Sequence, residues 1–339
     1  MKAIFLVKNG TSASAFELRE TPTPTPKANE VRIKVEAFGL NYADVMAREG
    51  MYEDCPPLPT VIGYDVVGHI DALGSDVTEF KIGQRVAALT RFGAYAEYAV
   101  TMADGVVAIP DHMPAGVATA LATQYSTAYF CAEDQTRLHP GDHVLVQAAA
   151  GGVGTALVQL AKRRGCIVYG TAGSKEKLDY LRRQGVDFPI NYREEDFEAV
   201  IKKQRGDAGL DVIFDSLGGS SVKKGRRLLG AGGRMICYGA AELSGGKNIF
   251  KILKFAAAFG ISSPIPLLQN SRGIIGVNML RIADNRPKTL ARVMRAVADL
   301  VIKGELHPEV GGEFSYTDIA KAHDFLASRK STGKIIVKW

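Results

Sequence analysis

The sequence predicts an α/β protein with two domains, one built on a mostly antiparallel β-barrel and one on a doubly wound parallel sheet. The chain has 339 residues, which is more than a single hydrophobic core usually serves. Residues 1–110 read as short strands broken by turn signals, whereas from residue 115 onward helical segments alternate with short apolar strands. Because parallel neighbouring strands need a crossover helix, this alternation indicates a parallel sheet with helices on both faces.

The expected strands of the N-terminal region are apolar runs separated by Gly, Pro and charged residues. They are KAIFLV at 2–7, EVRIKVEAFG at 30–39, VIGYDVVGHIDALG at 61–74, QRVAAL at 84–89, YAEYAV at 95–100 and GVVAIP at 105–110. Strands this short, with turns this frequent, are typical of a compact antiparallel barrel-like domain.

The expected elements of the second region alternate in type along the chain. The strands are HVLVQ at 143–147, CIVYG at 166–170, FPIN at 188–191, LDVIFD at 210–215 and RMICYG at 234–239, and the helices cover 152–164, 175–183, 195–203 and 220–229. A further helix at 287–304 precedes the strand-like GKIIVKW at 333–339. If this last strand rejoins the first sheet, the first domain comprises 1–122 and 279–339, and the second domain, 123–278, is an insertion.

The composition is that of a folded soluble protein, with 46% hydrophobic and 23% charged residues. The net charge of +6 is scattered among acids, which argues against nucleic-acid binding. Cys55, Cys131, Cys166 and Cys237 have neither metal-site nor redox-pair spacing and are expected to be reduced. The first ten residues, MKAIFLVKNG, contain an apolar run that is too short for a signal peptide and is soon followed by polar residues. A cytoplasmic location is therefore expected.

The segment 249–268, IFKILKFAAAFGISSPIPLL, is the one stretch that suggests a membrane. Two lysines, a glycine and two prolines interrupt it, and its uncharged part, 255–268, is shorter than the about 20 residues needed to span a bilayer. We expect an amphipathic helix followed by an apolar loop that lines a pocket or an interface. Peripheral contact with a membrane is the alternative.

A glycine motif lies in the middle of the chain, in VLVQAAAGGVGTALVQLAKRRG at 144–165. Ala149, Gly151 and Gly154 hold the spacing of a dinucleotide turn, directly after an apolar strand and at the start of a helix. The first small residue allows the bend, the second lets the backbone approach a pyrophosphate, and the third packs helix against strand. The motif therefore predicts a Rossmann domain whose helix N-terminus receives phosphate.

The end of the next expected strand indicates which nucleotide binds. An NAD site usually carries an acid there to hold the ribose 2′-hydroxyl. In VYGTAGSKEK at 168–177 no acid precedes Glu176, while Ser174 and Lys177 offer a hydroxyl and a cation to a 2′-phosphate. The stretch therefore favours NADPH, and Ser174 is also placed to cap the helix that starts near Lys175.

These motifs occur together with others along the whole chain: GLNYADVMAREGMY at 39–52, GYDVVG at 63–68, INYREEDF at 190–197, DSLGGS at 215–220, LLQNSRGIIGVNML at 267–280 and TGKIIV at 332–337. The set resembles the medium-chain dehydrogenase/reductase superfamily, in its zinc-independent quinone oxidoreductase branch. Within that branch it is most similar to the group named for the synaptic-vesicle amine transport protein. The resemblance implies a GroES-like substrate domain beside the Rossmann domain, and a homodimer joined through an edge strand at 272–279.

The resemblance also implies which residues bind the cofactor. They are Asn41, Thr127, Gly151, Gly152, Val153, Gly154, Thr171, Ser174, Lys177, Tyr192, Leu217, Tyr238, Gly239, Asn278 and Lys334. Within this set the four residues 151–154 are implied to cradle the pyrophosphate. Ser174, Lys177 and Tyr192 are implied to surround the 2′-phosphate.

Metal ligands are missing where the zinc-dependent relatives carry them. Those relatives have a cysteine near the position of Asn41 and a Gly-His-Glu motif where this chain reads Gly63-Tyr64-Asp65, and their cysteine-rich lobe is absent here. The six histidines are dispersed, without the paired spacing of a helical metal site. Because a catalytic zinc needs three protein ligands, no metal is expected.

Hydride transfer without a Lewis acid favours an acceptor that delocalises negative charge itself, such as a quinone or an α,β-unsaturated carbonyl. The resemblance to enoyl reductases implies that Tyr52 donates the proton, and the alternative is that Tyr52 only shapes the pocket. Asn41 is expected to orient the nicotinamide ribose or donate to the substrate, or to be structural at the start of a helix. Asp44 and Arg48, four residues apart, are expected to form a local ion pair.

The sequence thus predicts an NADPH-dependent, metal-independent reductase of the NADPH:quinone oxidoreductase type (EC 1.6.5) with a small-molecule acceptor. One alternative is an enoyl-thioester reductase that uses the same Tyr52. The other is a nucleotide-binding, membrane-associated protein with little catalytic activity.

Overall fold

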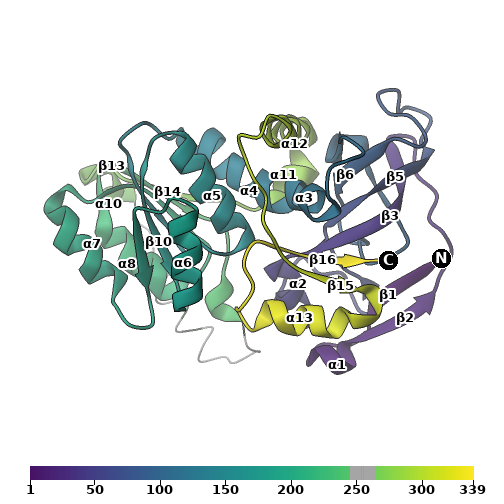
Figure 1. Ribbon diagram of the computed structural model, residues 1–339, viewed down its shortest axis with the longest axis horizontal. Coiled ribbons are helices and arrows are strands. Elements are labelled where there is room, and N and C mark those ends of the chain that lie inside the picture. Colours follow the sequence, from purple (N-terminus) through teal and green to yellow (C-terminus); the bar gives the residue numbers. More distant parts are fainter. Residues whose placement is uncertain (245–252, 254, 256–263) are drawn as a thin grey trace. The chain divides into compact units, whose positions relative to one another are not determined.

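The computed structural model describes residues 1–244, 253, 255 and 264–339. The apolar segment at 249–268 therefore lies largely outside the described residues, apart from 253, 255 and 264–268. The chain divides into two compact units (Figure 1). The first comprises Met1–Ser126 with Met279–Trp339, and the second comprises Thr127–Asn278.

The first unit contains two sheets. The three-stranded sheet has the order β2-β1-β4, and the larger sheet has the order β15-β16-β3-β5-β6-β8, with β7 also pairing β3. The strands are β1 Lys2–Leu6, β2 Phe16–Glu20, β3 Glu30–Leu40, β4 Thr60–Val61, β5 Asp65–Leu73, β6 Arg85–Leu89, β7 Tyr98–Met102, β8 Val106–Ala108, β15 Val310–Ser315 and β16 Lys334–Lys338. All of these pairings except β15 with β16 are antiparallel, which is the mostly antiparallel barrel that the sequence predicted.

The C-terminal strand β16 lies between β15 and β3 in this larger sheet. It pairs antiparallel with β3, so that Ile335 lies opposite Leu40. The first half of β3 alternates buried and exposed side chains, whereas its last four residues, 37–40, are all buried. Because alternation marks a strand with one solvated face and continuous burial marks one covered on both, the end of β3 is an interior position. Lys334, the first residue of β16, therefore enters the unit beside the buried end of β3.

Helices and short helical turns complete the first unit. They are α1 Ser12–Ala15, α2 Tyr42–Arg48, η1 Ala103–Gly105, α3 Ala115–Ala120, η2 Leu121–Tyr125, α11 Met279–Asn285, α12 Pro287–Ile302, η6 Tyr316–Asp318 and α13 Ile319–Ala327, and α4 Ser126–Tyr129 crosses the boundary between the units. The core of the unit is formed by apolar side chains from both sheets, including Ile4, Leu6, Phe38 and Val66, together with Tyr95 from the segment before β7.

The second unit is a six-stranded, all-parallel sheet of order β11-β10-β9-β12-β13-β14. Its elements are η3 Phe130–Thr136, β9 His143–Val146, α5 Gly152–Arg163, β10 Ile167–Ala172, α6 Lys175–Arg183, β11 Phe188–Asn191, α7 Phe197–Arg205, η4 Gly206–Ala208, β12 Leu210–Asp215, α8 Gly219–Leu228, β13 Leu229–Cys237, η5 Ala241–Leu243, α10 Pro264–Gln269 and β14 Gly273–Gly276. Figure 1 shows α5 to α8 packed around these strands. The doubly wound Rossmann prediction is confirmed.

The order of the strands places a topological switch point between β9 and β12. From β9 the sheet grows through β10 to β11 on one side, and then through β12, β13 and β14 on the other. In open parallel sheets, ligands bind beyond the carboxyl ends of the strands at such a point. The glycine motif follows β9, so it lies at this position.

Among the described residues, no helix is both long enough and apolar enough to cross a bilayer. All four cysteines are free thiols, and Cys131 and Cys166 are buried.

Candidate functional site

The glycine turn joins the buried strand β9 to the first turn of α5. Ala148 adopts a left-handed backbone with φ of 50°, and the Gly151 N–H donates to the Ala148 carbonyl over 2.9 Å. A Cβ added to Gly154 would lie 2.4 Å from the Ala148 carbonyl oxygen and 2.8 Å from the Ala149 Cα. Only a glycine therefore lets the start of α5 lie this close to the turn. The first N–H groups of a helix have no intrahelical acceptor, so residues 152–154 present donors for an anion.

Thr171, near the carboxyl end of β10, forms hydrogen bonds that hold this turn in place. Its hydroxyl donates to Gln147 Oε1 over 2.6 Å and accepts from the Ala148 N–H over 3.1 Å, while its carbonyl accepts from the Ala149 N–H over 3.0 Å. The side chain is fully buried. Its position explains the shape of the turn, and the direct cofactor contact expected of Thr171 stays a prediction.

The residues expected around a 2′-phosphate gather beyond the ends of β10 and β11. Ser174 caps α6, and its hydroxyl accepts from the Lys177 N–H over 3.4 Å, as the sequence predicted for the cap. A Cβ on Gly173 would lie 2.5 Å from the phenol oxygen of Tyr192, so this glycine makes room for the Tyr192 ring. Tyr192 itself is 42% exposed.

One acid also lies at this corner. The pKa of Glu176 is lowered, first by its own backbone N–H and then by the Ser174 hydroxyl, so the side chain is a carboxylate at neutral pH. Glu176 is fully exposed on the first turn of α6. The Ser174 hydroxyl therefore has two roles: it caps the helix and it interacts with Glu176.

Asp215 organises the loop after β12, a role that the sequence reading did not assign to it. Its buried carboxylate accepts from the backbone N–H groups of Leu217 and Gly218 over 2.9 and 2.7 Å, and from the Ser221 hydroxyl over 2.5 Å. Burial nevertheless raises the pKa of Asp215 above its usual range. These contacts fix the position of Leu217, one of the expected cofactor residues. The pattern DSLGGS, an acid before a Gly-Gly pair, was the available signal.

Three more expected cofactor residues lie around the neighbouring strands of the second unit. Tyr238 donates its N–H to the Asp215 carbonyl over 2.9 Å, and a Cβ on Gly239 would lie 2.6 Å from the Ser216 carbonyl oxygen. Asn278 follows β14, two residues beyond its last residue. Thr127 opens the second unit and is buried, whereas Asn41, Tyr52 and Lys334 belong to the first unit.

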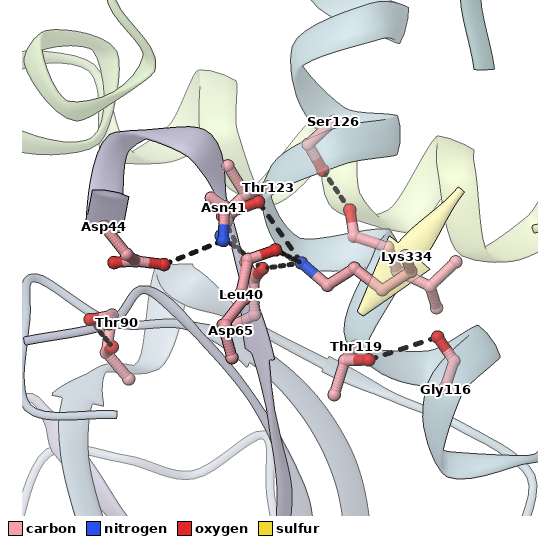
Figure 2. A network of polar contacts seen from close by, with 12 residues as sticks. Leu40, Asn41, Asp44, Asp65, Thr90, Gly116, Thr119, Thr123, Ser126 and Lys334 are labelled. Carbon is pink, nitrogen blue, oxygen red and sulfur yellow. Dashed lines mark hydrogen bonds and ion pairs between the residues drawn. The ribbon is translucent and has the colours of Figure 1, made fainter. Parts of the chain in front are cut away.

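A buried polar network surrounds Asn41 at the start of α2 (Figure 2). The Lys334 ammonium donates to Leu40 O over 3.4 Å, to Asn41 Oδ1 over 3.2 Å, and to Asp65 Oδ2. Asn41 Nδ2 donates to the same Asp65 oxygen over 2.6 Å, and the Thr123 hydroxyl donates to the other one. Lys334 and Asp65 are both fully buried. The network is therefore an internal ion pair with a carboxamide held against it.

The residues of this network, which the resemblance aligns with the metal ligands of zinc-dependent relatives, do not fit a catalytic zinc. Asn41 offers an amide in place of a thiolate, and both Asn41 and Asp65 already bind the ammonium of Lys334. Across the described part of the chain, His, Cys, Asp and Glu form no group of three or more that could hold a metal ion. Zinc prefers donor sets of nitrogen, sulfur and carboxylate oxygen.

Tyr52, the expected proton donor, lies in the same unit with its ring half-buried. Its ring packs edge-on against that of Tyr64, with centroids 6.3 Å apart. Burial raises the pKa of the Tyr52 phenol above its ordinary value. The phenol is therefore protonated at neutral pH, which is the state that a proton donor needs.

The predicted ion pair between Asp44 and Arg48 is wrong. Asp44 Oδ2 accepts from the Asn41 N–H over 2.7 Å, because an acid in the third helical position turns back to the start of its helix. Arg48 instead lies 3.5 Å from Glu49 Oε1 and 4.0 Å from Asp324 Oδ1. Asp44 is completely buried, and burial raises its pKa to about 7.

Because the pKa of Asp44 is raised, we predict that the stability of the protein depends on pH. A carboxyl whose pKa is higher in the folded than in the unfolded state stabilises the fold at pH values below its unfolded pKa. This contribution is lost as the pH rises through its folded pKa. Asp44→Asn removes the titration and keeps an acceptor for the Asn41 N–H. Between about pH 4 and about pH 8 we expect the free energy of unfolding of the native protein to fall by about 2 kcal/mol or more relative to Asp44→Asn. Urea unfolding of both proteins measures this, and a difference that does not change with pH would contradict it.

Comparison with known proteins places these features in context. Residues 27–111 match the family described as alcohol dehydrogenase GroES-like domain, and residues 152–296 match the family described as zinc-binding dehydrogenase. The chain is 36% identical over 93% of its length to the synaptic vesicle membrane protein VAT-1 homolog of Danio rerio, and spans 65% of that protein. It is 32% identical to the quinone oxidoreductase of Rattus norvegicus, covering 99% of this chain and 97% of that protein. It superimposes on Escherichia coli quinone oxidoreductase complexed with NADPH with a TM-score of 0.87 at 26% identity, covering 100% of both chains.

Proposed function

Because this chain belongs to the medium-chain dehydrogenase/reductase family, we propose that it is an NADPH-dependent reductase that delivers a hydride, without a metal, to a quinone or an α,β-unsaturated carbonyl. The observation that carries the proposal is the buried ammonium of Lys334, which binds Asn41 and Asp65. The resemblance implies zinc ligands near these two positions in the zinc-dependent relatives. The rat relative's name and the bound cofactor of the bacterial structure support the same activity and the same cofactor.

In the proposed reaction NADPH supplies the hydride when bound, and this chain positions the reactants and provides a proton. Backbone N–H groups of residues 152–154 bind the pyrophosphate at the N-terminus of α5. Lys177 and Tyr192 bind the 2′-phosphate, with Ser174. These contacts hold cofactor and acceptor in one complex, so the reaction no longer depends on their encounter in solution, and this proximity lowers the barrier.

The acceptor gains one hydride and one proton, and its oxygen carries negative charge in between. In the proposal the Tyr52 phenol donates a hydrogen bond and then the proton to that oxygen, and solvent returns the proton to Tyr52. The Asn41 carboxamide stabilises the same charge or holds the nicotinamide ribose. A conjugated acceptor spreads the charge, so these two neutral donors suffice.

Tyr52→Phe tests the proton donor. We expect kcat with an enone to fall about 100-fold, in the range of general acid catalysis, because phenylalanine keeps the ring packing and removes the proton. The Kd for NADPH should stay within about twofold of the native value, because such a shift is below 1 kcal/mol. Steady-state rates and a binding titration give both numbers. A kcat within threefold of native would show that Tyr52 only shapes the pocket.

A panel of acceptors tests the reaction class. NADPH oxidation is followed with a quinone, an enone, an enoyl thioester and a saturated ketone, before and after dialysis against a chelator. The proposal expects turnover with the quinone or the enone, none with the saturated ketone, and no effect of chelation. Exclusive turnover of the thioester would assign the chain to enoyl-thioester reduction instead, and metal-dependent turnover would overturn the mechanism.

The proposal extends to assembly and location. Among the described strands, β14 lies at one edge of the parallel sheet, and an edge strand can pair with a second strand. We propose that β14 of a second copy pairs there to give a homodimer, and a monomeric mass by light scattering would contradict this. The four free thiols fit a reducing compartment and hence the cytoplasm.

A further inference from the structure

We infer that Lys334 is a positioning residue, whose ammonium fills an internal cation site and thereby fixes the Asn41 carboxamide for the proposed hydride transfer. The inference rests on the proposed function for its kinetic consequence. It differs from the direct cofactor contact expected of Lys334, because the ammonium is fully buried and directed at three oxygen atoms of the protein.

The cation site is formed at the ends of three strands, β3, β5 and β16, and β16 is remote from the other two along the chain. A Cβ on Gly39 would lie 2.2 Å from Lys334 Cε and 2.6 Å from its Nζ, so only glycine at this point of β3 admits the lysine. Leu40 O, Asn41 Oδ1 and Asp65 Oδ2 then meet the three N–H donors of the ammonium. Figure 2 shows the side chain entering from β16 toward these oxygens.

The site sets the orientation of the Asn41 amide. Its Oδ1 accepts from the ammonium and its Nδ2 donates to the Asp65 carboxylate. A flipped amide would direct its N–H groups at the ammonium and its oxygen at the carboxylate, so both contacts would become repulsive. Of the two N–H groups on Nδ2, Asp65 accepts one. In the proposed reaction, the other N–H is the donor to a cofactor or substrate oxygen.

The charge balance explains why the network tolerates burial. A buried ammonium or carboxylate alone is strongly unfavourable, and a pair persists only when its remaining donors and acceptors are satisfied. Here Asp65 balances Lys334, and the Thr123 hydroxyl binds the second carboxylate oxygen. Removing the lysine therefore leaves an anionic cavity lined by the same oxygens, the size of a small primary ammonium ion.

Lys334→Ala tests the inference by chemical rescue. We expect kcat for NADPH oxidation with a quinone to fall about 100-fold, because a misplaced catalytic group costs that much. Ethylammonium chloride should restore at least a tenth of the native kcat, whereas sodium chloride at equal ionic strength should not. Lys338→Ala is the matched control, because Lys338 lies on the same strand but forms an exposed ion pair with Glu313. That control should keep native kcat and show no response to ethylammonium.

Gly39→Ala perturbs the same site without removing the charge of the Lys334 ammonium. The added methyl displaces the ammonium from Asn41, so we expect a similar loss of kcat that ethylammonium does not restore, because the cavity remains filled. If Lys334→Ala does not fold, Lys334→Met, which keeps the side-chain length, should lose kcat without rescue. Native kcat in Lys334→Ala, in Lys334→Met or in Gly39→Ala would overturn the inference.

A readout without turnover separates this inference from the proposed function. The Tm of Lys334→Ala should rise with ethylammonium concentration, while the Tm of Lys338→Ala should not. If the native protein fails to oxidise NADPH with every acceptor tested, the proposed function fails. The rise in the Tm of Lys334→Ala would still support the cation site. An equal response of the two variants would overturn the site itself.

Discussion

Gly154→Ala is expected to raise the Kd for NADPH at least about 100-fold, corresponding to about 2.7 kcal/mol of lost binding energy. The added Cβ would lie 2.4 Å from the Ala148 carbonyl oxygen, and 2.8 and 2.9 Å from the Ala149 Cα and carbonyl carbon. All three are backbone atoms, so no side chain can turn away to relieve the contact. The start of α5 must move, and the N–H groups that bind the pyrophosphate move with it.

Quenching of intrinsic fluorescence by NADPH, or calorimetry, measures this effect. Gly276→Ala is the matched control, because no atom of the described residues lies within 4 Å of a Cβ at Gly276 and the residue lies on the edge strand of the same sheet. It should bind NADPH like the native protein. Native affinity in a folded Gly154→Ala would show that the turn does not hold the cofactor.

Lys177→Ala is expected to narrow the preference for NADPH over NADH about tenfold, by weakening NADPH and leaving NADH unchanged. A charge-assisted contact with a phosphate contributes about 1.5 kcal/mol or more to binding. NADH has no 2′-phosphate, so its binding does not depend on this contact. Lys177 is half-buried on the first turn of α6, and its backbone N–H donates to the Ser174 hydroxyl.

The control for Lys177 is Lys175→Ala, because Lys175 is exposed on the same turn. Removing Lys175 should change the two Kd values alike and by less than about threefold. Binding titrations with both cofactors at two salt concentrations measure the preference. An unchanged ratio of Kd values in Lys177→Ala would remove the main support for NADPH over NADH.

Elements with a regular apolar pattern could be predicted closely from the sequence. The strands at 188–191 and 210–215 and the helix at 175–183 have the predicted bounds, because each combines a clear period with turn or cap residues at its ends. The strand β13 begins at Leu229, five residues before the predicted start, since Gly230 to Gly233 lack the apolar side chains that mark a strand. The pairing of β12 with β13 is irregular over this stretch.

The glycine turn and the cap at Ser174 were predictable because their signals are local. The buried network was not, because Asp65 and Lys334 are 269 residues apart and no local pattern links them. The same holds for Asp44, whose spacing to Arg48 suggested an ion pair but whose carboxylate turns back to the start of α2. The spacing of residues along the chain indicates which side chains are able to interact, whereas their burial in the tertiary structure determines which interactions form.

The rate of NADPH oxidation by the native protein with a quinone or an enone, compared with NADH under the same conditions and after exhaustive chelation, tests the central claim most directly. We predict turnover that prefers NADPH at least about tenfold and does not change when metal is removed. Binding of NADPH without oxidation by any conjugated acceptor would contradict the claim and identify the chain as a nucleotide-binding protein.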